Sequence, residues 1–124
     1  MLMLPPAVRV FVAPDPIDLH FSFDRLAGVV RNQLDGDPTS GHLFVFFNRQ
    51  RTRTKILFFD RSGYVLYYRR LERGTFQLPD LPPGAARLEV DAGVFAMILE
   101  GVDLRAPRRL RYSLAERKRP AIQS

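Results

Sequence analysis

Apolar side chains along this chain come in short runs separated by proline, glycine and aspartate, a pattern that predicts alternating strands and helices. The first run, residues 8–13, is β-branched and aromatic, and it predicts a strand that the Pro-Asp-Pro of residues 14–16 ends. Asp18 is the expected N-cap of a helix that the Asp-Gly-Asp-Pro of residues 35–38 terminates. Steps of three and four place five apolar residues on one face of that helix: Leu19, Phe23, Leu26, Val30 and Leu34.

Three strand-like runs follow in quick succession, at residues 42–47, 54–60 and 64–70. Their connections are too short for a crossover, so neighbouring strands are expected to be antiparallel and to form a meander. Two shorter strands are predicted at residues 75–78 and 87–90.

A last helix is predicted after Asp91, which is a suitable N-cap, and Gly101 is its expected C-cap. We therefore expect an α+β fold in which an antiparallel β-meander sheet is covered by one or two helices. Residues 1–104 would form one domain. Residues 105–124 lack an apolar period and are predicted to be a flexible, basic C-terminal tail.

Composition narrows the function classes further. The chain has 124 residues, 46% of them hydrophobic, which suits one domain with a real core. It has no cysteine, which excludes disulfides, thiolate metal sites and a cysteine nucleophile. The chain start lacks the basic segment of a signal peptide, and no apolar run approaches the ~18–20 residues of a membrane span. We expect a cytoplasmic protein with no membrane partner.

The net charge of +6 is distributed unevenly. Residues 49–73 and the tail from residue 105 onward are strongly basic, whereas residues 1–48 and 74–104 are acidic. Basic blocks attract phosphate backbones, although a solvated charged face is the alternative interpretation. Arginine supplies 17 of the 19 basic residues. Arginine binds phosphate bidentately, but a GC-rich genome would also favour it over lysine.

The densest basic segment alternates cations with polar residues. If it is extended, its four cations share one face at a spacing of about 6.6 Å, comparable with the phosphate repeat of a nucleic-acid strand. The alternative is a hairpin arm that keeps its charges apart in water. A second cluster and the tail supply further arginines. The predicted nucleic-acid-binding residues are Arg49, Arg51, Arg53, Lys55, Arg69, Arg70, Arg73, Arg108, Arg109 and Arg111.

Aromatic residues are interleaved with these cations and could stack on bases. About half of them must be buried if the sheet is to have a core. The tyrosines close to Arg69 and Arg70 are the better candidates for stacking, because they are amphipathic.

No motif for catalysis stands out. The two histidines, His20 and His42, lack zincin spacing, and there is no phosphate-binding glycine loop. Ser40 precedes His42 closely, but we interpret the segment as a turn that leads into a strand. The aspartates lie at element ends, where capping and turn roles suffice. We expect no catalytic residues, no metal site, no cofactor and no small-molecule substrate.

Residues 37–46, 55–60 and 63–76 resemble blocks of the TnpB-type accessory protein, or second-reading-frame protein, of the bacterial insertion-sequence sixty-six transposon family. The resemblance spans about residues 5–104, in order. It implies a non-catalytic protein needed for transposition beside a separate, larger transposase. It also implies a bacterial protein that is nucleoid-associated when bound to DNA. The chain departs from that family where Phe58-Phe59 replaces a tryptophan pair and where Arg51-Thr52-Arg53 replaces a glycine-containing connection. A third departure, His20-Phe21-Ser22, removes two cations that relatives often carry.

The sequence thus favours a transposition accessory protein that binds DNA, with element ends as the expected target and the transposase as a second partner. The alternative is a protein-interaction module that docks on the transposase without binding DNA itself. In that interpretation the acidic segments would face a basic surface of the transposase.

Overall fold

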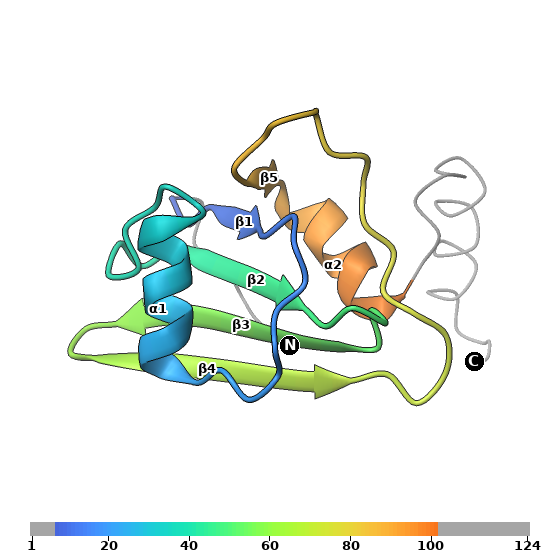
Figure 1. Ribbon diagram of the computed structural model, residues 1–124, viewed down its shortest axis with the longest axis horizontal. Coiled ribbons are helices and arrows are strands. Elements are labelled where there is room, and N and C mark those ends of the chain that lie inside the picture. The colour runs from blue at the N-terminus through green and yellow to red at the C-terminus, as the bar shows by residue number, and fades with distance from the viewer. Residues whose placement is uncertain (1–6, 102–124) are drawn as a thin grey trace, which may run out of the picture.

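The computed structural model describes residues 7–101, which form a five-stranded sheet with one helix on each face. The sheet order is β4-β3-β2-β1-β5. Its strands are β1 (Val10–Val12), β2 (Leu43–Phe47), β3 (Arg53–Asp60), β4 (Gly63–Arg70) and β5 (Leu88–Val90). The helices are α1 (Phe23–Asn32) and α2 (Ala92–Glu100). Figure 1 shows α1 crossing in front of strands β2 to β4. The α+β class is confirmed.

Strands β2, β3 and β4 form the predicted antiparallel meander. β1 differs, because it pairs with β2 in parallel and with β5 antiparallel. The connection from β1 to β2 contains α1 and is long enough to return the chain to the same end of the sheet. The short connections were enough to predict the antiparallel meander. The parallel pairing of β1 with β2 could not be predicted in this way, because it depends on where α1 packs on the sheet.

Two apolar cores lie on opposite faces of the same strands. Alternate residues of each strand point to opposite faces, so consecutive apolar residues in β2 supply both cores. Phe44 and Phe46 pack with Leu26 and Val30 of α1. On the other face, Val45 and its neighbours pack with α2 residues such as Ile98.

The start of α1 corrects the sequence interpretation. The helix begins at Phe23 with Ser22 as its N-cap, and not after Asp18. Asp18 instead accepts a hydrogen bond from the backbone N–H of His20 at 2.8 Å. The carbonyls of Leu19 and Phe21 accept hydrogen bonds from the Lys55 ammonium of β3. These tertiary contacts use backbone groups that a helical turn would have employed.

The strand predicted at residues 75–78 is also absent from the structure. The backbone N–H of Phe76 donates to the Arg51 carbonyl at 2.7 Å, and the ring of Phe76 is buried in the core on the α2 face. This segment is therefore anchored by that hydrogen bond and by the packing of Phe76 and Leu78, and it does not form a ladder.

The predicted ends of α2 are confirmed. The Asp91 carboxylate accepts a hydrogen bond from the Val94 backbone N–H at 2.8 Å. Gly101 closes the helix in the left-handed conformation, with φ of 74°. The predicted tail, including Arg108, Arg109 and Arg111, lies outside the described residues.

Candidate nucleic-acid interface

The connection between β2 and β3 is a compact turn centred on Asn48. The Asn48 side-chain oxygen accepts from the backbone N–H groups of Thr52 and Arg53, at 2.9 and 3.0 Å. The Asn48 backbone carbonyl accepts from the Arg51 N–H at 3.0 Å. Residues 48–52 fold back on this buried asparagine. The prediction that the segment from Arg49 to Lys55 is extended, with its four cations on one face, is therefore wrong. The exposed side chains of Arg49 and Arg51 are carried on the turn instead.

Arg51 has a backbone conformation that is rare for a residue with a β-carbon, with φ of 58°. Its carbonyl is fixed by the N–H of Phe76. This connection lacks the glycine that the family resemblance leads one to expect, and an arginine occupies the position where glycine would be least strained.

Arg53 and Arg70 lie directly opposite each other at the ends of β3 and β4. The Arg53 guanidinium donates a hydrogen bond to the Tyr68 hydroxyl at 3.3 Å. Arg70 forms an ion pair with Glu72 at 3.0 Å. Two guanidinium groups therefore share this end of the sheet, and within residues 7–101 a carboxylate compensates only one of them.

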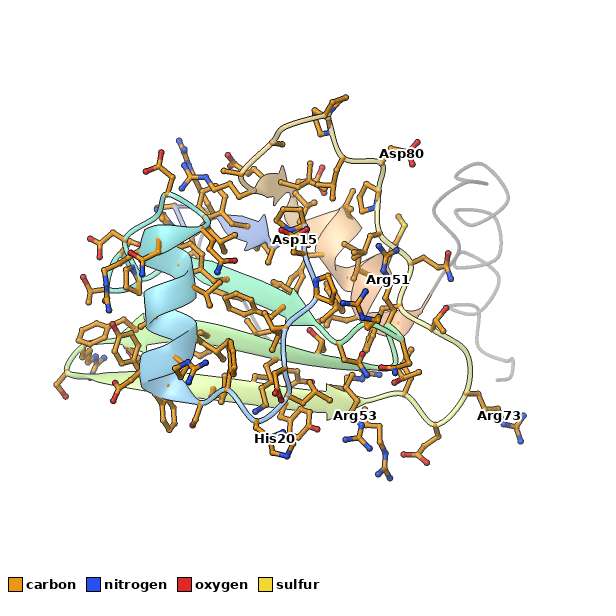
Figure 2. All side chains as sticks on the ribbon, in the orientation of Figure 1. Asp15, His20, Arg51, Arg53, Arg73 and Asp80 are labelled. Carbon is orange, nitrogen blue, oxygen red and sulfur yellow. The ribbon has the colours of Figure 1, made fainter. Side chains whose placement is uncertain are left out.

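Arg69 and Arg70 point to opposite faces of the sheet, because neighbouring strand residues alternate. Arg69 lies opposite Thr54, a residue that is fully buried. Arg73 follows β4 and is exposed. Figure 2 shows Arg53 and Arg73 at the same end of the molecule, where β4 finishes. The arginine cluster predicted at residues 69–73 is thus divided between two faces.

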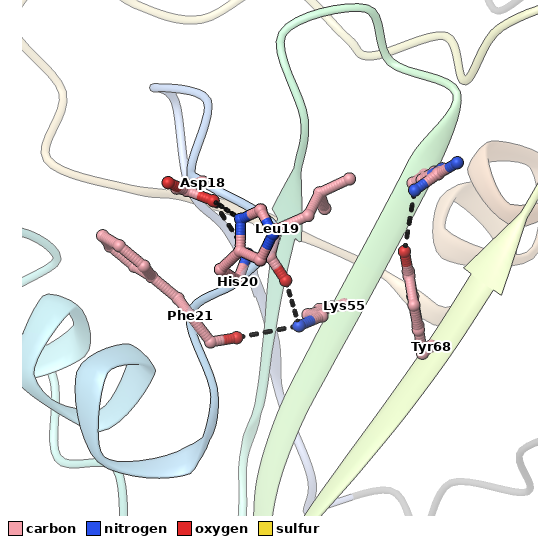
Figure 3. A network of polar contacts seen from close by, with 7 residues as sticks. Asp18, Leu19, His20, Phe21, Lys55 and Tyr68 are labelled. Carbon is pink, nitrogen blue, oxygen red and sulfur yellow. Dashed lines mark hydrogen bonds and ion pairs between the residues drawn. The ribbon is translucent and has the colours of Figure 1, made fainter.

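Lys55 has a different role from the one predicted. It is only 8% exposed, and its ammonium donates to the carbonyls of Leu19 and Phe21. Figure 3 shows this cation between the segment before α1 and the ring of Tyr68. The ammonium lies 5.1 Å from the centre of that ring. Its donors are directed at the protein's own backbone, so we remove Lys55 from the candidate interface.

Five predicted arginines have no carboxylate partner within the described part of the chain. Between residues 7–101, ion pairs join Arg9 to Glu89 and Arg70 to Glu72, and the Asp18 carboxylate contacts the His20 ring. Within those residues, no carboxylate lies within 4.0 Å of the guanidinium groups of Arg49, Arg51, Arg53, Arg69 and Arg73. Uncompensated guanidinium groups are suited to binding phosphate oxygens.

An open groove of about 430 Å³ runs between the turn and the segment that precedes α1. Arg49, Gln50, Arg53 and Tyr68 line one side. Residues 17–20 line the other and were missed, because the sequence pattern made Asp18 the N-cap of a helix and placed Leu19 and His20 inside it. An aspartate two residues before a histidine, after two prolines, was the available signal for a turn here.

Asp18 places one negative charge at the rim of this groove. Hydrogen bonds from the His20 backbone N–H and then from the His20 ring lower the pKa of the Asp18 carboxyl below its ordinary value of 3.8. Asp18 and His20 are both exposed. The groove is therefore positively charged near the turn and carries one ionised carboxylate on its opposite side.

The candidate catalytic and metal-ligating groups are not brought together. Ser40 Oγ accepts from the His42 backbone N–H at 3.2 Å, while His42 Nδ1 accepts from the Arg9 N–H at 3.0 Å. Among residues 7–101, no three histidine or acidic side chains are grouped as a metal ion would require. In the same part of the chain, no helix is both long and apolar enough to cross a membrane.

Comparison with known proteins gives a consistent picture. The family described as IS66 Orf2-like protein matches residues 8–109. Two proteins of Sinorhizobium fredii (strain NBRC 101917 / NGR234) are also similar. "Uncharacterized protein y4hO" is 34% identical over 108 residues, which cover 86% of this chain and 92% of the relative. "Uncharacterized protein y4jC" is 30% identical over 96 residues, covering 77% and 80% respectively. No solved structure matches the chain.

Proposed function

Because this chain belongs to the IS66 Orf2-like family of insertion-sequence-associated proteins, we propose that it is a non-catalytic accessory protein of DNA transposition. We propose further that it binds DNA through the arginines at one end of its sheet. The observation that supports this proposal is the set of guanidinium groups without carboxylate partners among residues 7–101.

The proposed surface, called here the arginine end, comprises Arg49, Arg51, Arg53, Arg70 and Arg73. The β2–β3 turn and the end of β4 meet there, at the opposite end of the sheet from the β3–β4 hairpin (Figure 1). Arg69 flanks it on the other face. On charge alone, Arg108, Arg109 and Arg111 extend the proposed contact into the tail. Phosphates are the expected ligands, since guanidinium groups bind phosphate oxygens bidentately.

The test is the salt dependence of binding to duplex DNA. The Arg49/Arg51/Arg53→Ala variant should bind more weakly, and the slope of log K against log salt should flatten by about 0.9 for each phosphate that the variant no longer neutralises. Fluorescence anisotropy with a labelled duplex, from ~50 to ~200 mM salt, measures both quantities.

A matched control removes the same charge elsewhere. Arg9 and Arg61 lie near the other end of the sheet, beside the start of β2 and in the β3–β4 hairpin, and Arg31 is in the last turn of α1. The Arg9/Arg31/Arg61→Ala variant should keep most of the wild-type slope. If the unaltered protein fails to bind duplex DNA of any sequence at ~50 mM salt, the proposal is wrong.

A second candidate function is docking on the transposase. Within the described residues, β4 has a strand neighbour on one side only and is eight residues long. Its free edge could accept an extended segment of the transposase. In that case the two proteins should copurify after nuclease treatment, and Val65→Lys on the exposed part of β4 should weaken the complex. Copurification that nuclease abolishes would count against this candidate.

A further inference from the structure

Tyr68 is the most exposed of the large hydrophobic residues in the described part of the chain. It is 52% exposed, whereas Tyr67, its neighbour on β4, packs against the core on the α2 face. Tyr64 is paired instead with the ring of Phe59, at 5.2 Å. Among the tyrosines of residues 7–101, only Tyr68 combines a largely accessible ring with a position at the arginine end.

The exposed ring of Tyr68 is held in place by two cationic side chains. The Arg53 guanidinium donates to its hydroxyl, and the Lys55 ammonium lies over one face of the ring. Lys55 is in turn held by the carbonyls of Leu19 and Phe21 (Figure 3). These contacts already restrict the conformations of the Tyr68 side chain, so a ligand that binds to it causes little further loss of side-chain entropy.

The surroundings of the ring suit a phosphate as well as an aromatic partner. Tyr68, Arg49 and Arg53 line the same groove. Arg53 uses one donor on the tyrosine, and its guanidinium has four more N–H groups. A stacking surface beside two arginines is the arrangement by which proteins bind unpaired nucleotides, the ring taking the base and the cations taking the backbone.

We propose that this groove binds an unpaired nucleotide of single-stranded DNA, with its base stacked on Tyr68 and its phosphate held by Arg49 and Arg53. The inference rests on the proposed DNA binding at the arginine end and adds the class of DNA that the groove takes. A base inside a duplex is already stacked on both sides and does not present a free face to the ring. The groove therefore favours single strands, whereas the outer arginines bind either form through phosphates.

The experiment compares Tyr68→Val with Phe23→Leu in the full chain. Valine keeps the strand propensity of the position and removes the ring. Phe23 is a 42%-exposed aromatic at the start of α1, and no part of it lines the groove. Each protein is titrated with a ten-nucleotide oligothymidylate and with a duplex of the same length.

Tyr68→Val should lose about tenfold or more in affinity for the oligothymidylate and little for the duplex. Phe23→Leu should bind both as the wild type does. Oligothymidylate should also quench tyrosine emission in the wild type, which can be measured because the chain has four tyrosines and no tryptophan. That quenching should be largely lost in Tyr68→Val, which lacks the stacked ring.

The outcomes separate the two proposals. If the duplex binds but Tyr68→Val leaves oligothymidylate affinity and quenching unchanged, the stacking site is wrong and the arginine end stands. If the wild type binds duplex but no oligothymidylate, the stacking site is likewise wrong. If neither DNA binds, both proposals are overturned.

Discussion

Arg51 combines a strained backbone with an exposed charged side chain. A β-carbon at its φ of 58° crowds the backbone, which is why glycine is the least strained residue there. The guanidinium has no carboxylate partner among residues 7–101 that would offset this cost. Strain of this kind is often retained where a side chain serves binding.

Arg51→Gly should therefore stabilise the fold and weaken DNA binding together. We expect the free energy of unfolding to rise by about 1 kcal/mol, since glycine relieves the strained conformation. Urea denaturation measures the gain. Arg51→Ala is the matched variant, because it removes the same charge but keeps the β-carbon. It should bind DNA as weakly as Arg51→Gly without the added stability, and equal stability of the two variants would contradict the strain.

Asp18 gives stability a dependence on pH. Its pKa is lowered in the folded protein, mainly by the His20 backbone N–H, so the ionised form is favoured by folding. That contribution to stability is present above pH 3.8, the ordinary pKa of an aspartate, and is lost as the pH falls through the lower pKa of Asp18 in the folded protein. The stability difference between wild type and Asp18→Asn should be larger at pH ~5 than near pH ~3. Urea unfolding at both pH values measures it, and a difference that grows toward acid pH would contradict the assignment.

At the scale of elements, Lys55 joins β3 to the segment that leads into α1. Its two carbonyl acceptors lie 34 and 36 residues away in sequence. The contact keeps residues 19–21 out of the helix and forms one wall of the groove. The segment is also held by the Ile17 backbone N–H, which donates to the Phe47 carbonyl at 2.9 Å, and by the short-range hydrogen bonds between Asp18 and His20.

Lys55→Met should reduce the free energy of unfolding by about 1–3 kcal/mol, because it leaves two partly buried carbonyls without their donor. The salt slope of duplex binding should be unchanged in the protein that remains folded. Arg53→Met, two residues earlier on the same strand, should do the reverse, with a small loss of stability and weaker binding. A reduced salt slope in Lys55→Met would return Lys55 to the interface.

At the scale of the whole molecule, one sheet serves two cores. Residues that alternate along β2 pack against α1 on one face and α2 on the other. Because the same strands form one side of both cores, unfolding of the sheet would expose both cores to solvent. The arginine end lies where the strands of this shared sheet finish, so its geometry depends on both cores.

Two mild core substitutions test this dependence. Val30→Ala on α1 should cost about 2 kcal/mol and Ile98→Val on α2 about 1 kcal/mol, because both side chains are fully buried. The double variant should lose close to the sum in a single cooperative transition, since the residues lie on opposite faces. Thermal and urea unfolding followed by circular dichroism measure this. Two separate transitions would show that the layers unfold independently.

The elements that depend on neighbouring residues could be predicted from the amino-acid sequence. The meander strands follow from apolar runs with short connections, and α2 follows from Asp91 and Gly101, because caps and tight turns are local interactions. The absence of cysteine and the two basic blocks are likewise properties of the chain alone. The family resemblance rested on ordered blocks of residues, and the match over residues 8–109 confirms it.

Features that depend on residues far apart in the chain became visible only in the folded protein. Only the fold could show that the carbonyls of Leu19 and Phe21 accept from Lys55, or that Asn48 folds an arginine-rich segment into a turn. Charge is visible in a sequence, but whether a charge is already satisfied depends on its neighbours in space, and hydrogen bonds between distant residues leave no periodic signal.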